Sequence, residues 1–432
     1  MTFQNVILLF TCLTLSLTSN LRFLESGDNT YDYSKIQATS KNKNISNADL
    51  ISTKADESIV YISDDNLVSI VDSIANKTGD ASNAENSHYY GVNSAVLVNN
   101  AKAQFVGFNI TSNAIGSNGI TVVNNGEASI ENLKIHTEKV NSSAIVANYG
   151  GKIRIHYTLL STYGDSSPCL ISEKDGGAIS ISYARMLTDG NESPIIYTVG
   201  NNISLDKTNT TTYNSQSIVM EGGFSRVRNS WMRGAGKGTY KNNGYIVMFT
   251  KNHGKTYFES ENTHYMLMGG TVYPYFYVTN TKAVIKLNRT VFDNGAATLL
   301  KASGNDYGWG TKGDNGAEVT LYINDQVVEG DIEVDSISQL TINLQNSTLK
   351  GTINNAKTAA LLEINMDAKS KIELTGHSYY TSLKNDDTTG SNIIKNSYSF
   401  EEYDENFDII KNDSKNLHSK ILIMMLLLII SF

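Results

Sequence analysis

One stretch of the chain reads Asn148-Tyr149-Gly150-Gly151-Lys152-Ile153-Arg154-Ile155, and its pattern returns later as Asp175-Gly176-Gly177-Ala178-Ile179-Ser180-Ile181. In both places a Gly-rich segment leads into a short run in which apolar and polar residues alternate. A period of two indicates a β-strand, and Gly, Asn and Asp tolerate the positive φ of tight turns. The stretch therefore predicts a turn followed by a strand with one buried face.

This unit recurs along most of the chain at a spacing of about 25 residues, which is a period typical of stacked repeats. The first aliphatic runs are centred on Val96, Ile120, Ile145, Leu170, Ile195, Ile218, Val247, Phe276 and Leu299. Each is followed by a second run, centred on Phe105, Ile130, Ile153, Ile179, Ile203, Val227, Tyr257, Val284 and Val319. A repeat this short cannot bury its own apolar face, so successive repeats must stack.

Short strands joined by tight turns and stacked at a single spacing close into a coil. The sequence therefore predicts an all-β fold, a right-handed, single-stranded parallel β-helix (solenoid) of about eleven to thirteen turns. Right-handedness is expected because crossovers between parallel strands almost always have that hand. Columns of Ile, Val and Leu are expected to fill its interior.

The two ends of the chain carry different signals. We expect a secretory signal peptide at 1–19, a flexible or capping lead at 20–56, the β-helix at 57–382, a polar stalk at 383–420 and a hydrophobic anchor signal at 421–432. The final apolar run is too short to span a bilayer. It follows a polar spacer and the small residues Asn412, Asp413 and Ser414, a pattern typical of a glycosylphosphatidylinositol signal. A short tail anchor and a terminal core strand are the alternatives.

Surface chemistry and charge narrow the range of partners. Once the signal peptide is removed, Cys169 would be the single cysteine, and its aliphatic surroundings predict a buried core residue without a disulfide. The net charge of −8 argues against nucleic acid and anionic membrane surfaces as partners.

In a secreted chain, Asn-X-Ser/Thr sequons are expected glycan acceptors on surface loops. They occur at Asn44, Asn76, Asn109, Asn141, Asn191, Asn202, Asn209, Asn288, Asn346 and Asn412.

Two insertions, 80–93 and 303–316, interrupt the regular repeat and carry aromatic residues. Tyr89 and Tyr90 lie in the first, and Tyr307 and Trp309 lie in the second. Loops concentrate binding function and aromatic faces stack on sugar rings, so these four are the candidate carbohydrate-binding residues. The alternative is that they shield the side of the coil, because aromatic residues bury large areas. No cofactor and no metal site are expected, since the histidines lack metal-ligand spacing.

Several blocks of the sequence resemble bacterial β-helix surface proteins that are adhesin-like and pectin-lyase-like in fold. These blocks are residues 85–97, 275–281 and 299–303, Trp309-Gly310 through Asn315-Gly316, and 330–338. The likeness extends from Glu57 to Leu383, which is most of the chain. It implies the parallel β-helix fold and implies no established reaction.

An enzyme of this fold is the main alternative. Galacturonan hydrolases of the fold resemble one another in an Asn-Thr-Asp strand, an Asp-Asp pair, a Gly-His-Gly loop and an Arg-Ile-Lys strand. This set does not occur here in that form, since the Asp-Asp pairs of the chain, Asp64-Asp65 and Asp386-Asp387, lie near the two ends, outside the regular coil. A lyase would use the basic patch with Arg226 and Arg228, which share one strand face. No acidic cluster for calcium accompanies them, so ion pairs with Glu221 and Glu259 on neighbouring turns are the structural alternative.

The leading hypothesis is a non-catalytic, glycosylated cell-surface protein that presents a β-helix for adhesion or coat formation. It would lie on the outer face of the plasma membrane, held by the lipid anchor, with carbohydrate or another cell surface as its partner. The alternatives are an extracellular polysaccharide lyase or glycoside hydrolase of pectin-lyase-like fold, and a lectin-like carbohydrate-binding surface protein.

Overall fold

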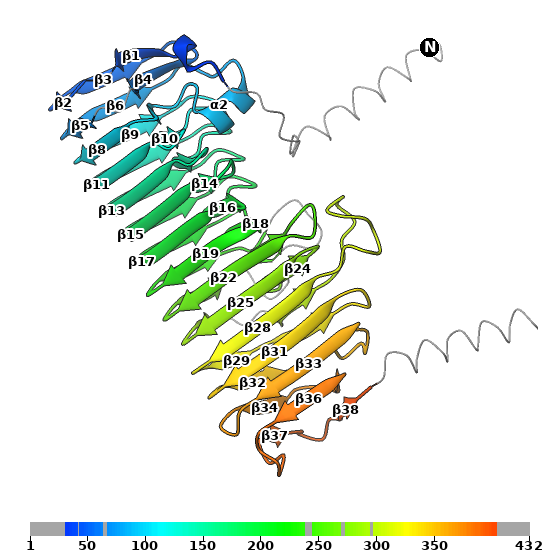
Figure 1. Cartoon of the computed structure of the whole chain (residues 1–432). Helices are drawn as coiled ribbons and strands as arrows, with labels where there is room; N and C mark the ends of the chain where they lie inside the picture. Colours follow the sequence, from blue (N-terminus) through cyan, green and yellow to red (C-terminus); the bar gives the residue numbers. More distant parts are fainter. Residues whose placement is uncertain are drawn as a thin grey trace, which may run out of the picture. The chain divides into compact units, whose positions relative to one another are not determined.

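The computed structural model describes residues 31–41, 43–63, 67–237, 244–268, 273–293 and 297–403. The chain forms two units, Met1–Lys35 and Ile36–Phe432. The described part of the first unit holds only the 3₁₀ helix η1 (Tyr33–Lys35). The second unit is a parallel β-solenoid of about 14 turns (Figure 1). The predicted signal peptide 1–19, the anchor signal 421–432 and Asn412, Asp413 and Ser414 lie outside the described residues.

Twelve successive turns each contribute one strand to a 12-stranded sheet, here called sheet A. Its strands are paired in parallel, each with the equivalent strand of the next turn. In spatial order they are β1 (Gln37–Lys41), β4 (Glu57–Ile62), β7 (Val96–Asn99), β10 (Ile120–Val123), β12 (Ile145–Ala147), β14 (Leu170–Ser172), β16 (Ile196–Val199), β18 (Ile218–Glu221), β21 (Ile246–Phe249), β24 (Phe276–Thr279), β27 (Thr298–Ala302) and β30 (Asp331–Val334).

The rest of each turn forms a second parallel surface with two arms, joined at a bend. In four middle turns both arms belong to one long strand: β11 (Glu127–Thr137), β13 (Lys152–Thr162), β15 (Ala178–Thr188) and β17 (Asn202–Thr212). Elsewhere the first arm is β2 (Ile45–Ser46), β5 (Leu67–Val71), β8 (Lys102–Val106), β19 (Gly223–Arg228), β22 (Lys255–Glu261), β25 (Lys282–Asn288), β28 (Glu318–Asn324), β31 (Gln339–Gln345), β33 (Leu361–Met366) and β36 (Ser382–Asn385). The second arm is β3 (Asp49–Ser52), β6 (Ile74–Lys77), β9 (Asn109–Ser112), β20 (Trp231–Gly234), β23 (His264–Leu267) and β26 (Val291–Asp293), and then β29 (Val327–Glu329), β32 (Thr348–Gly351), β34 (Lys371–Leu374) and β37 (Ile393–Ile394).

A residue with positive φ marks the bend between the arms in successive turns. We call these residues the bend column: Asn132, Tyr157, Tyr183, Lys207, Asn229, Asn262, Arg289, Asp325 and Asn346. The bend interrupts the alternation of the strand, as β13 illustrates. His156 and Tyr157 both face outward, while Ile155 and Thr158 on either side are buried. Even-numbered residues of β13 therefore face outward before the bend, and odd-numbered residues face outward after it. The first outward residue of the second arm comes two positions after the bend residue.

The core follows from the pairing register, and it refines the predicted run centres. In sheet A the stacked column contains Ile196, Ile246 and Leu300, each one residue from the predicted Ile195, Val247 and Leu299. In the first arm, the predicted core residues Tyr257 and Val284 face outward, whereas Phe258 and Ile285 fill the interior. A shift of one residue moves a strand side chain to the other face, so locating an aliphatic run does not fix its inward residues. Cys169 is fully buried, as predicted.

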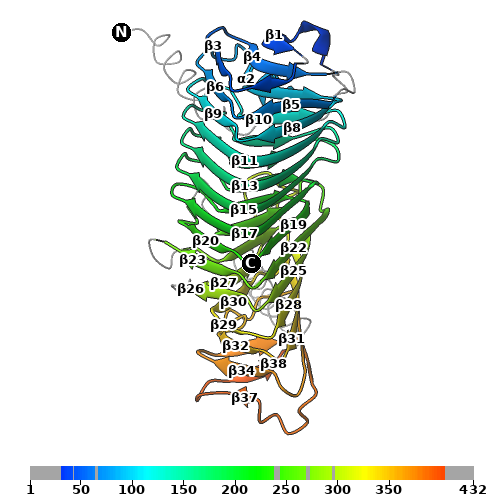
Figure 2. The ribbon, with the colours of Figure 1, turned by 90° about the vertical axis from the view of Figure 1, so that its left-hand side faces the viewer.

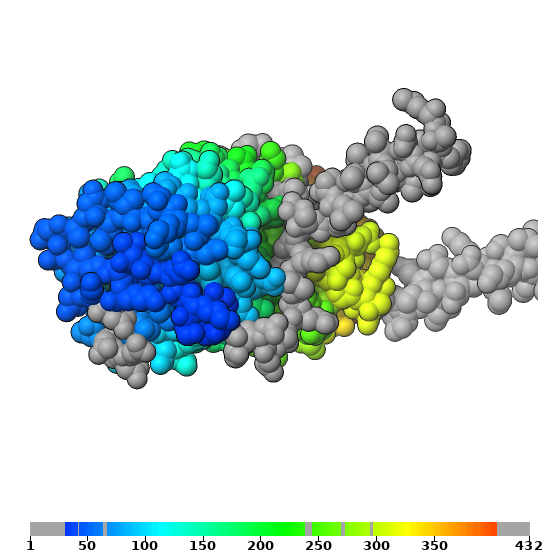
Figure 3. Space-filling view, turned by 90° about the horizontal axis from the view of Figure 1, so that it is seen from above, coloured from blue at the N-terminus to red at the C-terminus, as the bar shows by residue number. Residues whose placement is uncertain are grey.

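The solenoid extends beyond the predicted limits 57–382 at both ends. Strand β1 pairs with β4, and β2 and β3 pair with β5 and β6, so residues predicted to form a lead belong to the first turn. Figure 3 looks onto this end, with the first turns in blue. At the other end β36, β37 and β38 (Phe400–Glu402), which pairs with β35 (Ser378–Tyr380), extend into the predicted stalk. These end strands are short or polar, so counting aliphatic runs did not reveal them.

The first insertion contains the α-helix α2 (Ala84–Tyr90). The side chain of Asn83 accepts hydrogen bonds from the backbone N–H groups of Glu85 and Asn86, and Gly91 ends the helix at φ 75°. These are the usual caps at the two ends of a helix. The Nδ2 group of Asn148 donates to the carbonyl oxygen of Tyr89 at 3.1 Å, which holds α2 against the sheet A side of the solenoid.

Candidate ligand-binding groove

The outward face of the second arm carries a regular column of side chains, one from each turn. We call it the floor column, and register pairs its members in the order Asn109, Lys134, Leu159, Arg185, Asn209, Trp231 and His264. Because neighbouring strands lie about 4.8 Å apart, the column is a ladder along the solenoid axis. Figure 2 looks onto this face, with the bent strands β11, β13, β15 and β17 one below the other.

A shallow groove runs between the bend column and the floor column. It has a volume of about 940 Å³ and extends from β11 to β23. A second hollow of about 690 Å³ adjoins it toward the far edge of the second arm. Lys134, Leu159, Arg185 and Asn209 line both, so the two form one continuous depression.

Aromatic and aliphatic side chains remain exposed in the groove. Tyr157 and Tyr183 lie beside each other at the bend, with ring centroids 5.1 Å apart. Trp231 is 39% exposed, and its ring is nearly parallel to that of His264 at 4.9 Å. Leu159, on the same turn as Tyr157, is 46% exposed. An exposed apolar group of this kind, rimmed by polar residues, is typical of a ligand-binding groove.

The charge of the groove is positive, although the whole chain is acidic. Lys134, Arg185 and Lys207 line the main groove, and Arg233 lines the adjoining hollow. Among the described residues, no Asp or Glu lines either one. Neither Lys134 nor Arg185 makes an ion pair within the described part of the chain. Their charges are therefore available to a ligand.

Lys207 is held in place by its neighbour in the bend column. Its Nζ atom donates to the hydroxyl oxygen of Tyr183 at 2.6 Å and lies 4.7 Å from the centre of that ring. The hydrogen bond with Tyr183 raises the pKa of Lys207 above its ordinary value. Lys207 thus stays protonated, and the pair presents a cation and an aromatic face together.

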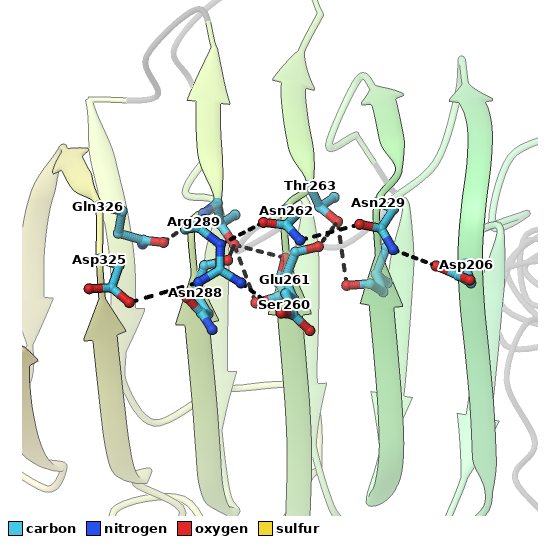
Figure 4. Close-up of polar contacts among 12 residues, drawn as sticks. Asp206, Asn229, Ser260, Glu261, Asn262, Thr263, Asn288, Arg289, Asp325 and Gln326 are labelled. Carbon is cyan, nitrogen blue, oxygen red and sulfur yellow. Dashed lines mark hydrogen bonds and ion pairs between the residues drawn. The ribbon is translucent and has the colours of Figure 1, made fainter.

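One edge of the groove is built from a chain of polar contacts, shown in Figure 4. Asn229 donates to the carboxylate of Asp206 at 2.7 Å, and Asn262 donates to the side-chain oxygen of Asn229 at 3.3 Å. Arg289 then donates to Asn262 and to Glu261, both at 2.7 Å. Asn and Asp tolerate the positive φ of the bend, so the residues that shape the turn also link successive turns. The edge is therefore tied together across several windings.

The structure places the four predicted aromatic residues away from this groove. Trp309 is buried (9% exposed) and lies flat on Phe249, with ring centroids 3.8 Å apart and planes 12° apart. Tyr307 is half-buried, 5.4 Å from Trp309. The insertion 303–316 therefore covers sheet A, which is the shielding alternative.

Tyr89 and Tyr90 are half-buried at α2. Tyr90 stacks on Tyr149 with parallel planes at 5.6 Å, and the Nζ atom of Lys174 lies 4.4 Å from the centre of the Tyr89 ring. Both tyrosines thus attach the helix to the turns beneath it. The structure does not bring the two pairs together. Tyr307 and Trp309 pack on β21 and β24, whereas Tyr89 and Tyr90 lie beside β10 to β14.

The arginines considered for a lyase lie on the first arm. The guanidinium of Arg226 pairs with Glu259 on the next turn at 2.6 Å, as predicted, and Arg228 is exposed. Glu221 does not join them, because it ends β18 in sheet A. Within the described residues, no three His, Cys, Asp or Glu side chains are grouped to hold a metal ion.

Sequence reasoning did not single out Tyr157, Tyr183, Arg185 or Trp231 as a binding set. A signal for two of them exists: Tyr157 and Tyr183 each follow an alternating run and occupy the same place in consecutive repeats. The other members become neighbours only through the register of the turns, which the sequence alone does not state.

The predicted glycan acceptors lie at the surface wherever they can be placed. None of the nine in the described residues is buried, and Asn412 lies outside them. Two, Asn109 and Asn209, belong to the floor column.

Among the described residues, no helix is long and apolar enough to cross a bilayer.

Comparison of the chain with protein-family models, with curated proteins and with solved structures finds no match. The inference about function therefore rests on the solenoid, the chemistry of the groove and the sequence signals at the two ends.

Proposed function

We propose that this protein is a non-catalytic, secreted surface protein that binds an extended acidic polysaccharide along the groove and uses this binding for adhesion. The observation that carries the proposal is a face with exposed rings and free cations and no carboxylate among its described lining residues. The secretory and anchor-like signals of the sequence support an extracellular location. The resemblance to adhesin-like, pectin-lyase-like β-helix proteins agrees with this role.

The groove offers the two contacts that an acidic polysaccharide needs. The C–H faces of sugar rings pack on aromatic rings, and Trp231 and Tyr183 are exposed for that purpose. Carboxylate or sulfate groups form charge-assisted hydrogen bonds with Lys134 and Arg185. These two cations lie two turns apart in one column, about 10 Å along the axis. A linear polymer with charges repeated along its length fits such a ladder better than a compact ligand does.

The groove supports binding better than catalysis. Glycoside hydrolysis requires two carboxyl groups on opposite sides of the scissile bond, one to donate a proton and one to attack or activate water. A polysaccharide lyase requires a base together with groups that neutralise the sugar carboxylate, often through calcium. The described lining of the groove supplies cations without acidic partners. The hydrolase and lyase alternatives therefore rank below binding.

The test is a binding panel with matched arginine variants. The folded protein, freed of its N-glycans, is titrated with polygalacturonate, alginate and chondroitin sulfate, and with neutral dextran and mannan. We expect binding of at least one acidic polymer, and a loss of about tenfold or more in Arg185→Ala, since a hydrogen bond to a charged group contributes about 1.5–3 kcal/mol.

Arg154→Ala is the control, because Arg154 is also exposed, on the neighbouring strand β13, but lies on the first arm. Equal losses in both variants, or binding of neutral polymers alone, would refute the proposed groove. Release of shortened or unsaturated products would instead favour the enzyme alternative.

A further inference from the structure

We infer that the glycan of Asn209 lies in the groove, so that modification of this one residue closes the binding face. The inference rests on the proposed function, because it requires the chain to pass through a glycosylating secretory pathway. It goes further in identifying Asn209 as the residue that controls access.

Asn209 occupies the middle of the binding face. It begins the sequon Asn209-Thr210-Thr211 and belongs to the floor column. Arg185 precedes it by one turn, and Trp231 follows it by one turn. It lines both the main groove and the adjoining hollow. A glycan attached here has the groove on both sides of its attachment point.

The side chain of Asn209 is available for modification. Asn209 is exposed, and its Oδ1 atom accepts a single long hydrogen bond of 3.4 Å from Arg233. Its Nδ2 atom, to which the sugar is attached, donates no hydrogen bond within the described residues. By contrast, the Nδ2 atoms of Asn191 and Asn346 donate to the carboxylates of Asp165 and Asp325.

The neighbours of Asn209 suit the first sugars of an N-glycan. Trp231 lies between His264, on which it stacks, and the turn of Asn209. An indole ring packs well against the C–H face and the acetamide methyl group of N-acetylglucosamine, because both are apolar. The glycan would thereby cover Trp231, which is otherwise an unusually exposed apolar side chain. A neutral glycan on this path would also separate Arg185 from any incoming acidic polymer.

Asn202 provides a matched control. It lies on the same strand β17, is exposed and is also a sequon, but it belongs to the first arm. A glycan on Asn202 therefore projects from another face of the same turn. Any effect specific to Asn209 must come from its place in the groove.

The experiment uses the full chain secreted from a eukaryotic host and compares it with Asn209→Gln, Thr211→Ala and Asn202→Gln. Glycopeptide mass spectrometry first establishes whether Asn209 is modified. Quenching of tryptophan fluorescence by neutral acrylamide then reports on Trp231, since the chain has two tryptophans and Trp309 is buried. We expect quenching to increase at least twofold in Asn209→Gln and in Thr211→Ala, and to be unchanged in Asn202→Gln.

Binding of the acidic polymers is then measured on the same proteins. We expect binding to strengthen about tenfold or more when the Asn209 sequon is removed, and removal of glycans from the folded wild type to have the same effect. An unmodified Asn209, or equal quenching in all proteins, overturns the inference. If quenching changes as expected but no acidic polymer binds any variant, the inference about the glycan holds and the proposed function fails. Thr211→Ala keeps the asparagine, so agreement between the two sequon variants excludes an effect of misfolding in either.

Discussion

At the scale of single residues, the bend column decides which side chains reach the groove. Each bend residue has positive φ, which is unfavourable for most residues and easier for Asn, Asp and Gly. Asn132, Asn229 and Asn262 follow this preference, whereas Tyr157 and Tyr183 do not. The turn itself therefore does not require a tyrosine at either position, since asparagine adopts this conformation more readily.

The first prediction concerns Tyr157→Asn. The change relieves a backbone conformation that costs a typical residue roughly 1–2 kcal/mol, and it removes a ring contact worth about 0.5–1.5 kcal/mol. We therefore expect a thermal midpoint close to that of the wild type, together with weaker binding of the acidic polymer. Calorimetry and titration of the same sample check both halves. Tyr213→Ala, which removes an exposed tyrosine that does not line the groove, should leave binding intact.

The second prediction concerns the buried carboxyl group of Glu221. Glu221 is 7% exposed, and its Oε2 atom has no hydrogen-bond partner among the described residues. Burial raises the pKa of Glu221 from 4.5 to about 7, while Lys251 acts against the shift. The folded state thus holds a proton that the unfolded state releases between these two values. Stability should fall as the pH rises from about 4.5 to 7, by up to about 3 kcal/mol.

The pair of His88 and Glu173 also makes the stability of the fold decrease as the pH rises, but at higher pH than Glu221 does. Burial alone would lower the pKa of His88, but the carboxylate of Glu173, bonded to it at 2.5 Å, raises it overall. The stabilisation from this pair is complete below the ordinary pKa of histidine and is lost as the pH rises through the raised pKa.

The measurement is the free energy of unfolding from pH 4 to pH 9. The decline between about pH 4.5 and 7 should be abolished in Glu221→Gln and unchanged in Glu131→Gln, an exposed control on β11. A decline that persists in Glu221→Gln would contradict the assignment.

At the scale of elements, the two insertions and the second arm divide the aromatic residues by role. Trp309 seals sheet A over Phe249, whereas Trp231 stands exposed in the floor column. The third prediction follows from this contrast. Trp309→Ala should destabilise the fold by about 3–5 kcal/mol, as for other buried aromatic residues, and leave ligand affinity unchanged at temperatures where it is folded. Trp231→Ala should do the opposite, with a thermal midpoint near that of the wild type and binding reduced about tenfold or more.

The same contrast shows what the sequence could and could not provide. The spacing of aliphatic runs identified the solenoid, because each turn must bury a similar strand at a similar interval. It did not provide the inward residue of every run, as Tyr257 and Val284 show, because adjacent residues of a strand point to opposite faces and the centre of an aliphatic run does not say which of them faces inward. The sequence also left open whether Trp309 binds a ligand or shields the coil, because a Gly-rich insertion can fold back on the sheet as easily as project from it. The groove escaped notice because Lys134, Arg185 and Trp231 are far apart in sequence and meet only through register.

At the scale of the whole molecule, a cationic groove lies on a chain with a formal charge of −8. The net charge and the groove cations act on an acidic polymer over different distances. The net charge repels it from afar, and Lys134 and Arg185 attract it on contact. At an ionic strength near 0.01 M the screening length is about 30 Å, so the repulsion reaches well beyond the surface, whereas near 0.1 M it shrinks to about 10 Å.

The last prediction is that the association rate with an acidic polymer passes through a maximum as salt increases. Added salt first removes the long-range repulsion and speeds encounter, and then screens the contacts with the groove itself. Stopped-flow measurements of Trp231 fluorescence in a protein without the Asn209 sequon, from about 0.01 to 1 M salt, provide the curve. In Arg185→Ala the falling branch should be shallower, because fewer counterions are exchanged, while the rising branch should be steeper, because the net charge becomes more negative. A rate that decreases steadily from the lowest salt concentration would contradict this prediction. It would mean that attraction by the groove outweighs repulsion by the net charge at every distance.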